Sequence, residues 1–280
     1  MNITDHNIDN GKAFDWGRTS ADYAQYRDIY PAVFYQKIID RGLCTAGQTV
    51  LDLGTGTGVL PRHLYDYGAR WIATDISPEQ IEQARRLSEG MDIEYHALSA
   101  EQLDFPDQTF DVITACQCFW YFDHEQLMPK LYRMLKPNGV ILVLYMAWLP
   151  FEDNIAGASE RLVLQYNPDW SGAGETRRPI RIPSCYHDRF DCTDHEEYLL
   201  RVPFTRESWH GRMKACRGIG ASLSGEEIHA WEQEHRRLLD TIAPPSFDIL
   251  HHAALTCMTA LDDSGGVPPL STPLPLPEIY

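Results

Sequence analysis

Glycines and an acid in the first half of the chain have types and spacing that could build a ligand site. The glycines are Gly54, Gly56 and Gly58, and Asp52 lies two residues before the first of them. Glycine has no Cβ and tolerates positive φ, so a ligand can approach the main chain closely at such a turn. The helix predicted after the turn offers unpaired N–H groups at its start, which suit a polar ligand.

Two more acids follow the next predicted strands. Asp75 ends a strand about twenty residues further on, where an acid can bind ribose hydroxyls. Glu101 follows the third strand, at the same carboxyl edge of a parallel sheet. Dinucleotide enzymes favour G-x-G-x-x-G, and Val59 stands where that pattern has its last glycine. A nicotinamide-dependent dehydrogenase is therefore an alternative that the spacing disfavours.

The combination resembles the small-molecule branch of the class I S-adenosylmethionine-dependent methyltransferases. The resemblance covers about residues 48–147 and rests on five stretches: VLDLGTGTG at 50–58, ATDIS at 73–77, SAEQL at 99–103, FDVITA at 110–115 and LKPNGVI at 135–141. The flanking segments FDWG at 14–17, YAQYR at 23–27 and FWYFD at 119–123 are also similar to those of the family.

The resemblance implies S-adenosylmethionine as cofactor and S-adenosylhomocysteine as product. Asp75 would bind the ribose hydroxyls, Ile76 would flank the adenine, and Cys116 would lie near the sulfonium. The full set of cofactor-binding residues implied is Tyr23, Arg27, Asp52, Gly54, Thr55, Gly56, Asp75, Ile76, Ala100, Glu101, Cys116 and Gln117.

Aromatic residues on both sides of the cofactor motifs are the candidates for an acceptor pocket. They are Tyr26, Tyr30, Phe119, Trp120 and Tyr121. The N-terminal aromatics lie in a helical pattern that begins near Ser20 and is divided by Pro31. This segment is either a covering helix or a lid over the ligand.

A catalytic residue is optional for this chemistry, because the methyl group leaves from a cationic sulfur and the protein mainly aligns the reactants. An acceptor that must lose a proton would benefit from a general base. Candidate groups are His124, His187, His195 and His210, with Tyr121 and Tyr145 as positioning residues.

Cysteine and histidine residues in the second half invite a metal hypothesis. Cys185, His187, Cys192 and His195 could each bind zinc, but their spacing matches no common zinc motif, and no metal is predicted. The nearby basic run 177–181 favours a solvated surface over a site for an acidic substrate.

Strand and helix patterns alternate through the first half. They predict an α/β fold: a Rossmann-like, doubly wound seven-stranded sheet, mostly parallel with an antiparallel last strand, plus a helical and irregular cap. We expect residues 167–195 to be an irregular loop and a sixth strand to begin at Tyr198. The predicted parts are a helical lid segment 1–45, a cofactor-binding half 46–150, a cap insertion 151–197, a C-terminal completion of the sheet 198–262 and a proline-rich tail 263–280.

Composition limits the partners. The 280-residue chain is 44% hydrophobic and carries a formal net charge of −16, which argues against a nucleic-acid partner. The N-terminus has no signal-peptide pattern and the apolar runs are too short to span a bilayer. With seven cysteines and no C-x-x-C pair, a cytoplasmic location is expected.

The sequence predicts a small-molecule methyltransferase and leaves its oligomeric state open. A catalytically silent S-adenosylmethionine-binding protein is the other alternative.

Overall fold

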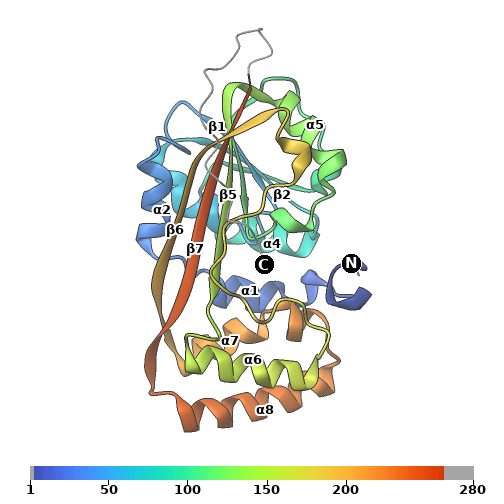
Figure 1. Ribbon diagram of the computed structural model, residues 1–280, viewed down its shortest axis with the longest axis vertical. Helices are drawn as coiled ribbons and strands as arrows, with labels where there is room; N and C mark the ends of the chain where they lie inside the picture. The colour runs from blue at the N-terminus through green and yellow to red at the C-terminus, as the bar shows by residue number, and fades with distance from the viewer. Residues whose placement is uncertain (1–2, 262–280) are drawn as a thin grey trace.

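A computed structural model of the chain describes residues 3–261 as an α/β sheet layer with a helical layer beneath one edge (Figure 1). The strands are β1 (Thr49–Leu53), β2 (Arg70–Asp75), β3 (Ile93–Ala97), β4 (Phe110–Cys116), β5 (Leu135–Trp148), β6 (Phe190–Thr205) and β7 (Ser246–Ala260). The α-helices are α1 (Ser20–Tyr26), α2 (Ala32–Ile39), α3 (Val59–Leu64), α4 (Pro78–Leu87), α5 (His124–Met134), α6 (Asn154–Tyr166), α7 (Arg206–Lys214) and α8 (Gly225–Ile242).

The seven strands form one sheet in the order β3-β2-β1-β4-β5-β7-β6. The first five strands are parallel to one another, while β7 runs antiparallel to both β5 and β6. The predicted fold class is confirmed. The strand order reverses at β1 and β4, so the carboxyl ends of these two strands form the switch point where ligands bind in open α/β sheets.

Alternate residues of the central strands supply two separate apolar cores. Val50, Val112 and Leu142 pack toward α2 in one cluster. Leu51 and Ile113 pack on the other face in the α5 cluster. All five are fully buried, as expected for strands covered on both sides. This double burial explains the continuous apolar runs in the sequence and holds the carboxyl ends of the strands in fixed positions.

The helix starts follow local capping signals. Ser77 and Asp123 accept hydrogen bonds from backbone N–H groups in the first turns of α4 and α5. Complete capping boxes begin α7 at Thr205 and α8 at Ser224. Each cap supplies partners for N–H groups that a helix start otherwise leaves unpaired.

Strand β6 is longer than the sequence predicts. It begins at Phe190, so part of the expected irregular loop 167–195 is strand. The first half of β6 is rich in acidic and polar residues, and most of these residues are exposed or half-buried. The strand lies at the edge of the sheet and is held by its backbone pairing with β7. An edge strand needs no apolar face to pair, which is why the pattern resembles a loop.

The helical layer contains α1, α6, α7 and α8, and α8 lies farthest from the sheet (Figure 1). Two buried histidines connect α7 and α8: the Nδ1 atoms of His210 and His235 are 3.0 Å apart. Nε2 of His235 lies 2.9 Å from Oγ of Ser159 on α6, which also accepts a hydrogen bond from Nε1 of Trp209. One ring must accept at Nδ1, so the contact requires that at least one of the two histidines is neutral.

Acidification is expected to destabilise this layer. Burial lowers the pKa of His210 to about 4 and that of His235 to about 3. The unfolded values lie near 6.5, so between these limits the unfolded chain binds more protons and stability is lost as the pH falls. We expect the free energy of unfolding to drop by ~3 kcal/mol for His210 alone over this range.

Urea unfolding at a series of pH values from 7.5 downward measures this loss of stability. The His235→Gln variant should show a shallower pH dependence, and an equal dependence would contradict the assignment.

No helix among residues 3–261 has the length and apolar character needed to cross a membrane. The proline-rich tail predicted at 263–280 lies outside the described residues.

Candidate functional site

The glycine turn between β1 and α3 has the geometry that the sequence predicts. Gly54, Gly56 and Gly58 have φ values of 58°, 57° and 73°, a region that side-chain-bearing residues rarely adopt. A Cβ on Gly54 would lie 2.8 Å from the side chain of Cys118, and one on Gly58 would lie 2.3 Å from the hydroxyl of Tyr95. Both conformation and space therefore require glycine here.

Asp75, at the end of β2, fixes this turn. The backbone N–H of Gly56 donates to Oδ2 of Asp75 at 2.9 Å, and the N–H of Ser77 donates to Oδ1 at 2.9 Å. Burial raises the pKa of the Asp75 carboxyl, and these two N–H groups oppose the shift. The carboxylate thus lies between the glycine turn and the start of α4, at the carboxyl edge of the sheet.

Asp52 lies inside the sheet, with its side chain withdrawn from the surface of the turn. Its residue is 1% exposed, and the hydroxyl of Thr114 on β4 donates to its Oδ1 at 2.6 Å. Burial raises the pKa of Asp52 to about 6. In the glycine turn that follows β1, the hydroxyl of Thr57 is buried and has no hydrogen-bond partner among residues 3–261. A polar ligand atom at this turn would provide one.

The carboxyl end of β4 is held against β1 and β5. Gln117 has a φ of 66°, a strained value for this residue type. Its backbone N–H donates to the carbonyl of Leu144 at 3.0 Å and its side-chain amide donates to that of Met146. Cys116 lies beside Tyr30, with its Sγ 3.5 Å from the hydroxyl. Strained backbone fixed in this way is frequent at binding sites.

The N-terminal segment covers the glycine turn. A Cβ on Gly56 would lie 3.4 Å from the ring of Tyr23 on α1. Arg27 lies over the ring of Tyr23 at 4.5 Å and donates to its hydroxyl at 3.1 Å. Trp16 packs edge-on against both Tyr23 and Tyr121, with centroids 6.4 and 6.3 Å away. The structure therefore brings together Tyr23, the glycine turn and the aromatic turn 119–121.

A buried ion pair ties the start of the chain to this cover. Nε and Nη2 of Arg217 donate to the two carboxylate oxygens of Asp9 at 2.7 and 3.0 Å. The same guanidinium donates to the hydroxyls of Tyr121 and Ser171. Asp9 is 1% exposed and Arg217 is 8% exposed, so the pair is desolvated. One arginine thus connects the N-terminal segment, the aromatic turn and the loop after α6.

The remaining predicted cofactor residues lie along the same edge. Ile76, directly after β2, is 39% exposed, whereas Ala100 is buried in the core beneath β3. A carboxylate oxygen of Glu101 accepts from the backbone N–H of Asp123 at 3.0 Å, which joins the turn after β3 to the start of α5.

The predicted acceptor-pocket residues divide between two elements. Tyr26 on α1 packs against α7, where a Cβ on Gly211 would lie 2.3 Å from its ring. Tyr30 stacks on Phe34 at 4.4 Å. Trp120 is 47% exposed, while Phe119 is buried.

The candidate bases fall into two groups. His124 and Tyr145 contact the aromatic turn, with ring centroids 4.4 Å from Phe119 and 5.1 Å from Trp120 respectively. His187 is exposed after a short turn, Nδ1 of His195 lies 3.0 Å from the hydroxyl of Thr256 on β7, and His210 lies within the α7–α8 packing. The structure therefore places His124 and Tyr145 against the aromatic turn 119–121 and the other three histidines elsewhere.

The cysteine and histidine residues around 185–195 do not converge. Among residues 3–261, no set of three or more His, Cys, Asp or Glu side chains is arranged to hold a metal ion. In the basic run, Arg177 forms an ion pair with Glu152 and Arg178 pairs with Glu175, and both arginines are exposed.

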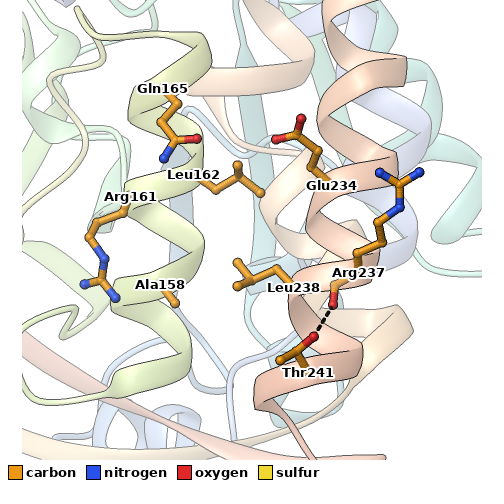
Figure 2. A pocket seen from close by; sticks show the side chains of 8 residues that line it. All are labelled: Ala158, Arg161, Leu162, Gln165, Glu234, Arg237, Leu238 and Thr241. Carbon is orange, nitrogen blue, oxygen red and sulfur yellow. Dashed lines mark hydrogen bonds between the residues drawn. The ribbon is translucent and has the colours of Figure 1, made fainter.

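A groove of about 530 Å³ lies away from this edge, between α6 and α8. Figure 2 shows Leu162 and Leu238 facing each other across it, with polar residues at its rim. The groove is distant from the glycine turn because α8 is the outermost helix (Figure 1).

Three residues near the site were not predicted from the sequence: Asp9, Arg212 and Arg217. Asp9 and Arg217 pair across 208 residues, and Arg212 lies over Trp148 on another element, so local spacing could not reveal them. An arginine next to buried Trp209 and Met213 was the one available hint at Arg212.

A glycine turn at the switch point of a parallel sheet, with an acid at the end of the next strand, defines a nucleotide-type cofactor domain. Residues 51–143 match the family model described as a methyltransferase domain. This part of the chain is similar to a methyltransferase domain, and its fold is the one found in class I methyltransferases.

Comparisons with known proteins agree with this assignment. The chain is 35% identical over 120 residues to an uncharacterized methyltransferase-like protein of Schizosaccharomyces pombe, covering 42% of this chain and 46% of that one. It is 37% identical over 114 residues to the demethylmenaquinone methyltransferase of Thermus thermophilus, covering 39% and 52%. It is 31% identical over 134 residues to the ubiquinone biosynthesis O-methyltransferase of Pseudomonas entomophila, covering 46% and 56%. The chain thus spans about half the length of the curated relatives it matches.

Solved structures share the fold at low identity. A Bacillus halodurans protein provisionally assigned as a methyltransferase aligns with a TM-score of 0.51 at 16% identity, covering 81% of this chain and 99% of that chain. The YjhP protein of E. coli aligns with a TM-score of 0.51 at 17% identity, covering 87% and 99%.

Proposed function

We propose that the protein transfers a methyl group from S-adenosylmethionine to a small-molecule acceptor. The observation that carries this proposal is the position of the Asp75 carboxylate, 2.9 Å from the N–H of Gly56 at the switch point of the sheet. The fit to the cofactor is supported by the positive φ of the three glycines and by the buried hydroxyl of Thr57, which has no hydrogen-bond partner among residues 3–261.

The chain offers a partner for each polar part of that cofactor. Asp75 would bind the ribose hydroxyls, the glycine turn and Arg27 would hold the amino-acid part, and Ile76 with Ala100 and Glu101 would border the adenine. Asp52, which is buried in the sheet, would stabilise the conformation of the glycine turn. Cys116 and Gln117 would lie nearest the sulfonium, where Gln117 keeps the end of β4 tied to β5.

When bound, S-adenosylmethionine supplies a methyl group on a good leaving group. The residues of the chain then need to align the acceptor with that methyl and exclude water. Trp16, Tyr23 and Tyr121 are packed as a cover that can exclude water. For an acceptor that loses a proton, His124 is the better-placed histidine; its pKa is lowered by burial, so it is neutral and able to accept at pH 7.

The names of two relatives refer to demethylmenaquinone and to ubiquinone biosynthesis. Both names indicate small-molecule chemistry, and we extend only that class to this chain. We further propose a cytoplasmic location and no nucleic-acid partner, in keeping with the net charge of −16.

Calorimetry with S-adenosylhomocysteine and with NAD tests the cofactor. We expect saturable binding of the first and none of the second; preference for NAD would overturn the proposal in favour of a dehydrogenase. Transfer of a labelled methyl group to a panel of small acceptors then separates an enzyme from a silent binding protein.

A further inference from the structure

Arg212 on α7 is a buried cation with an incomplete set of partners. It is 5% exposed, and its guanidinium lies over the ring of Trp148 at 4.8 Å. Nη1 donates to Sγ of Cys216 at 3.1 Å, while Nε is buried and has no hydrogen-bond partner among residues 3–261. A thiol and an aromatic face compensate a buried guanidinium only weakly, because its full partner is an anion.

A second cation lies beside it. Arg27 donates to the hydroxyl of Tyr23. Neither Arg27 nor Arg212 forms an ion pair with an acid of the described chain. Burial, and after it the charge of Arg27, lowers the pKa of Arg212 to about 10. His251, whose pKa burial lowers to about 3, is neutral and adds no charge beside Arg212. Two adjacent uncompensated guanidiniums are unfavourable unless an anion joins them.

The two arginines lie at the edge where an acceptor must approach. Trp148, beneath Arg212, ends β5, and Cys116, beside Tyr30, ends β4. Tyr30 lies close enough to Arg212 to affect the pKa of the guanidinium. The cation therefore lies between α7 and the carboxyl ends of β4 and β5, next to the predicted position of the sulfonium.

We propose that Arg212 binds an oxyanion of the methyl acceptor, a carboxylate or a phosphate, and so determines which acceptors are accepted. This inference rests on the proposed function, since it places the anion in the acceptor pocket of a methyltransferase. The planar fork of a guanidinium can donate two parallel hydrogen bonds to such a group, and Nε, which has no partner within the described part of the chain, belongs to that fork. Arg27, which we assign to the amino-acid part of the cofactor, adds positive charge nearby.

Benzoate, phenyl phosphate and benzamide are suitable probes, because they share one ring and differ in charge. Binding to the full-length wild-type protein is measured by calorimetry, with and without S-adenosylhomocysteine. We expect at least one of the two anions to bind saturably and at least about tenfold more tightly than neutral benzamide. The comparison of benzoate with phenyl phosphate identifies the kind of anion. The proposal would be overturned if the three probes bind with equal affinity or if none of them binds.

The Arg212→Met variant tests the residue itself, with Arg161→Met on the exposed face of α6 as the matched control. We expect Arg212→Met to lose anion binding at least about tenfold and to keep its affinity for S-adenosylhomocysteine. Its melting temperature should equal or exceed that of the wild type, since an uncompensated buried charge is removed. A purely structural arginine would instead give a less stable variant with unchanged anion binding.

Further measurements distinguish a role of Arg212 in acceptor binding from a role in cofactor binding. Arg212→Lys retains the charge without the fork, so it should bind the anion with intermediate affinity even if the Met variant does not fold. Loss of S-adenosylhomocysteine binding in Arg212→Met would assign Arg212 to the cofactor and overturn the proposal. Failure of the wild type to bind S-adenosylhomocysteine would reject the proposed function, while the anion titrations without it still decide the role of Arg212.

Discussion

Asp75→Ala is expected to lower the affinity for S-adenosylhomocysteine by about 100-fold or more. Two hydrogen bonds from ribose hydroxyls to the carboxylate would be lost, and hydrogen bonds to charged groups contribute about 1.5–3 kcal/mol each. The same change removes the acceptors of the N–H groups of Gly56 and Ser77, so the turn itself would be less fixed. Calorimetry on the wild type and the variant measures the difference.

Asp240→Ala is the matched control, because Asp240 is an exposed acid on α8 that pairs with Arg206. It should leave the affinity unchanged. Asp75→Asn should fall between wild type and Asp75→Ala, since the amide keeps one acceptor oxygen. An unchanged affinity in Asp75→Ala would remove Asp75 from the site and with it the main support for the cofactor assignment.

Asp9→Asn should destabilise the protein by about 3–5 kcal/mol, the usual cost of leaving one partner of a buried ion pair alone. The substitution keeps the shape of the side chain, and asparagine tolerates the φ of 49° at this position well. The effect can therefore be attributed to the uncompensated charge of Arg217. Urea unfolding measures it, and limited proteolysis shows whether the N-terminal segment is released first.

Asp169→Asn is the control for this pair, because the exposed Asp169 accepts from the side chain of the adjacent Asn10 at 2.8 Å. It should change the free energy of unfolding by less than about 0.5 kcal/mol. If Asp9→Asn unfolds like the wild type and its N-terminal segment stays resistant to protease, the ion pair does not hold the cover in place.

The sheet could be predicted because its signals are local. The apolar runs from Val50 and Val140 and the glycine turn each lie within a few residues, and the structure places them as expected. The start of β6 could not be predicted, since Asp191, Thr193 and their neighbours are polar and pair only through the backbone of β7. Edge pairing depends on the neighbouring strand and not on the strand's own side chains.

The candidate site was predictable only where one motif contains it. Asp75 and Gly56 follow from the spacing of the first two strands. The environment of Arg212 depends on Trp148 and Arg27, which lie on other elements. Whether an arginine is paired, and with what, is a property of tertiary packing. Only the structure shows that Arg212 has no acidic partner among residues 3–261.

The ion pair between Asp9 and Arg217 joins positions separated by 208 residues. During synthesis Asp9 leaves the ribosome before Arg217, which follows about 10–40 s later at the usual rates of 5–20 residues per second. Until then Asp9 is solvated, and Trp16 and Tyr23 have no fixed place over the glycine turn. The cover of the site is therefore among the last parts of the protein to assemble, although it is encoded at the beginning of the chain.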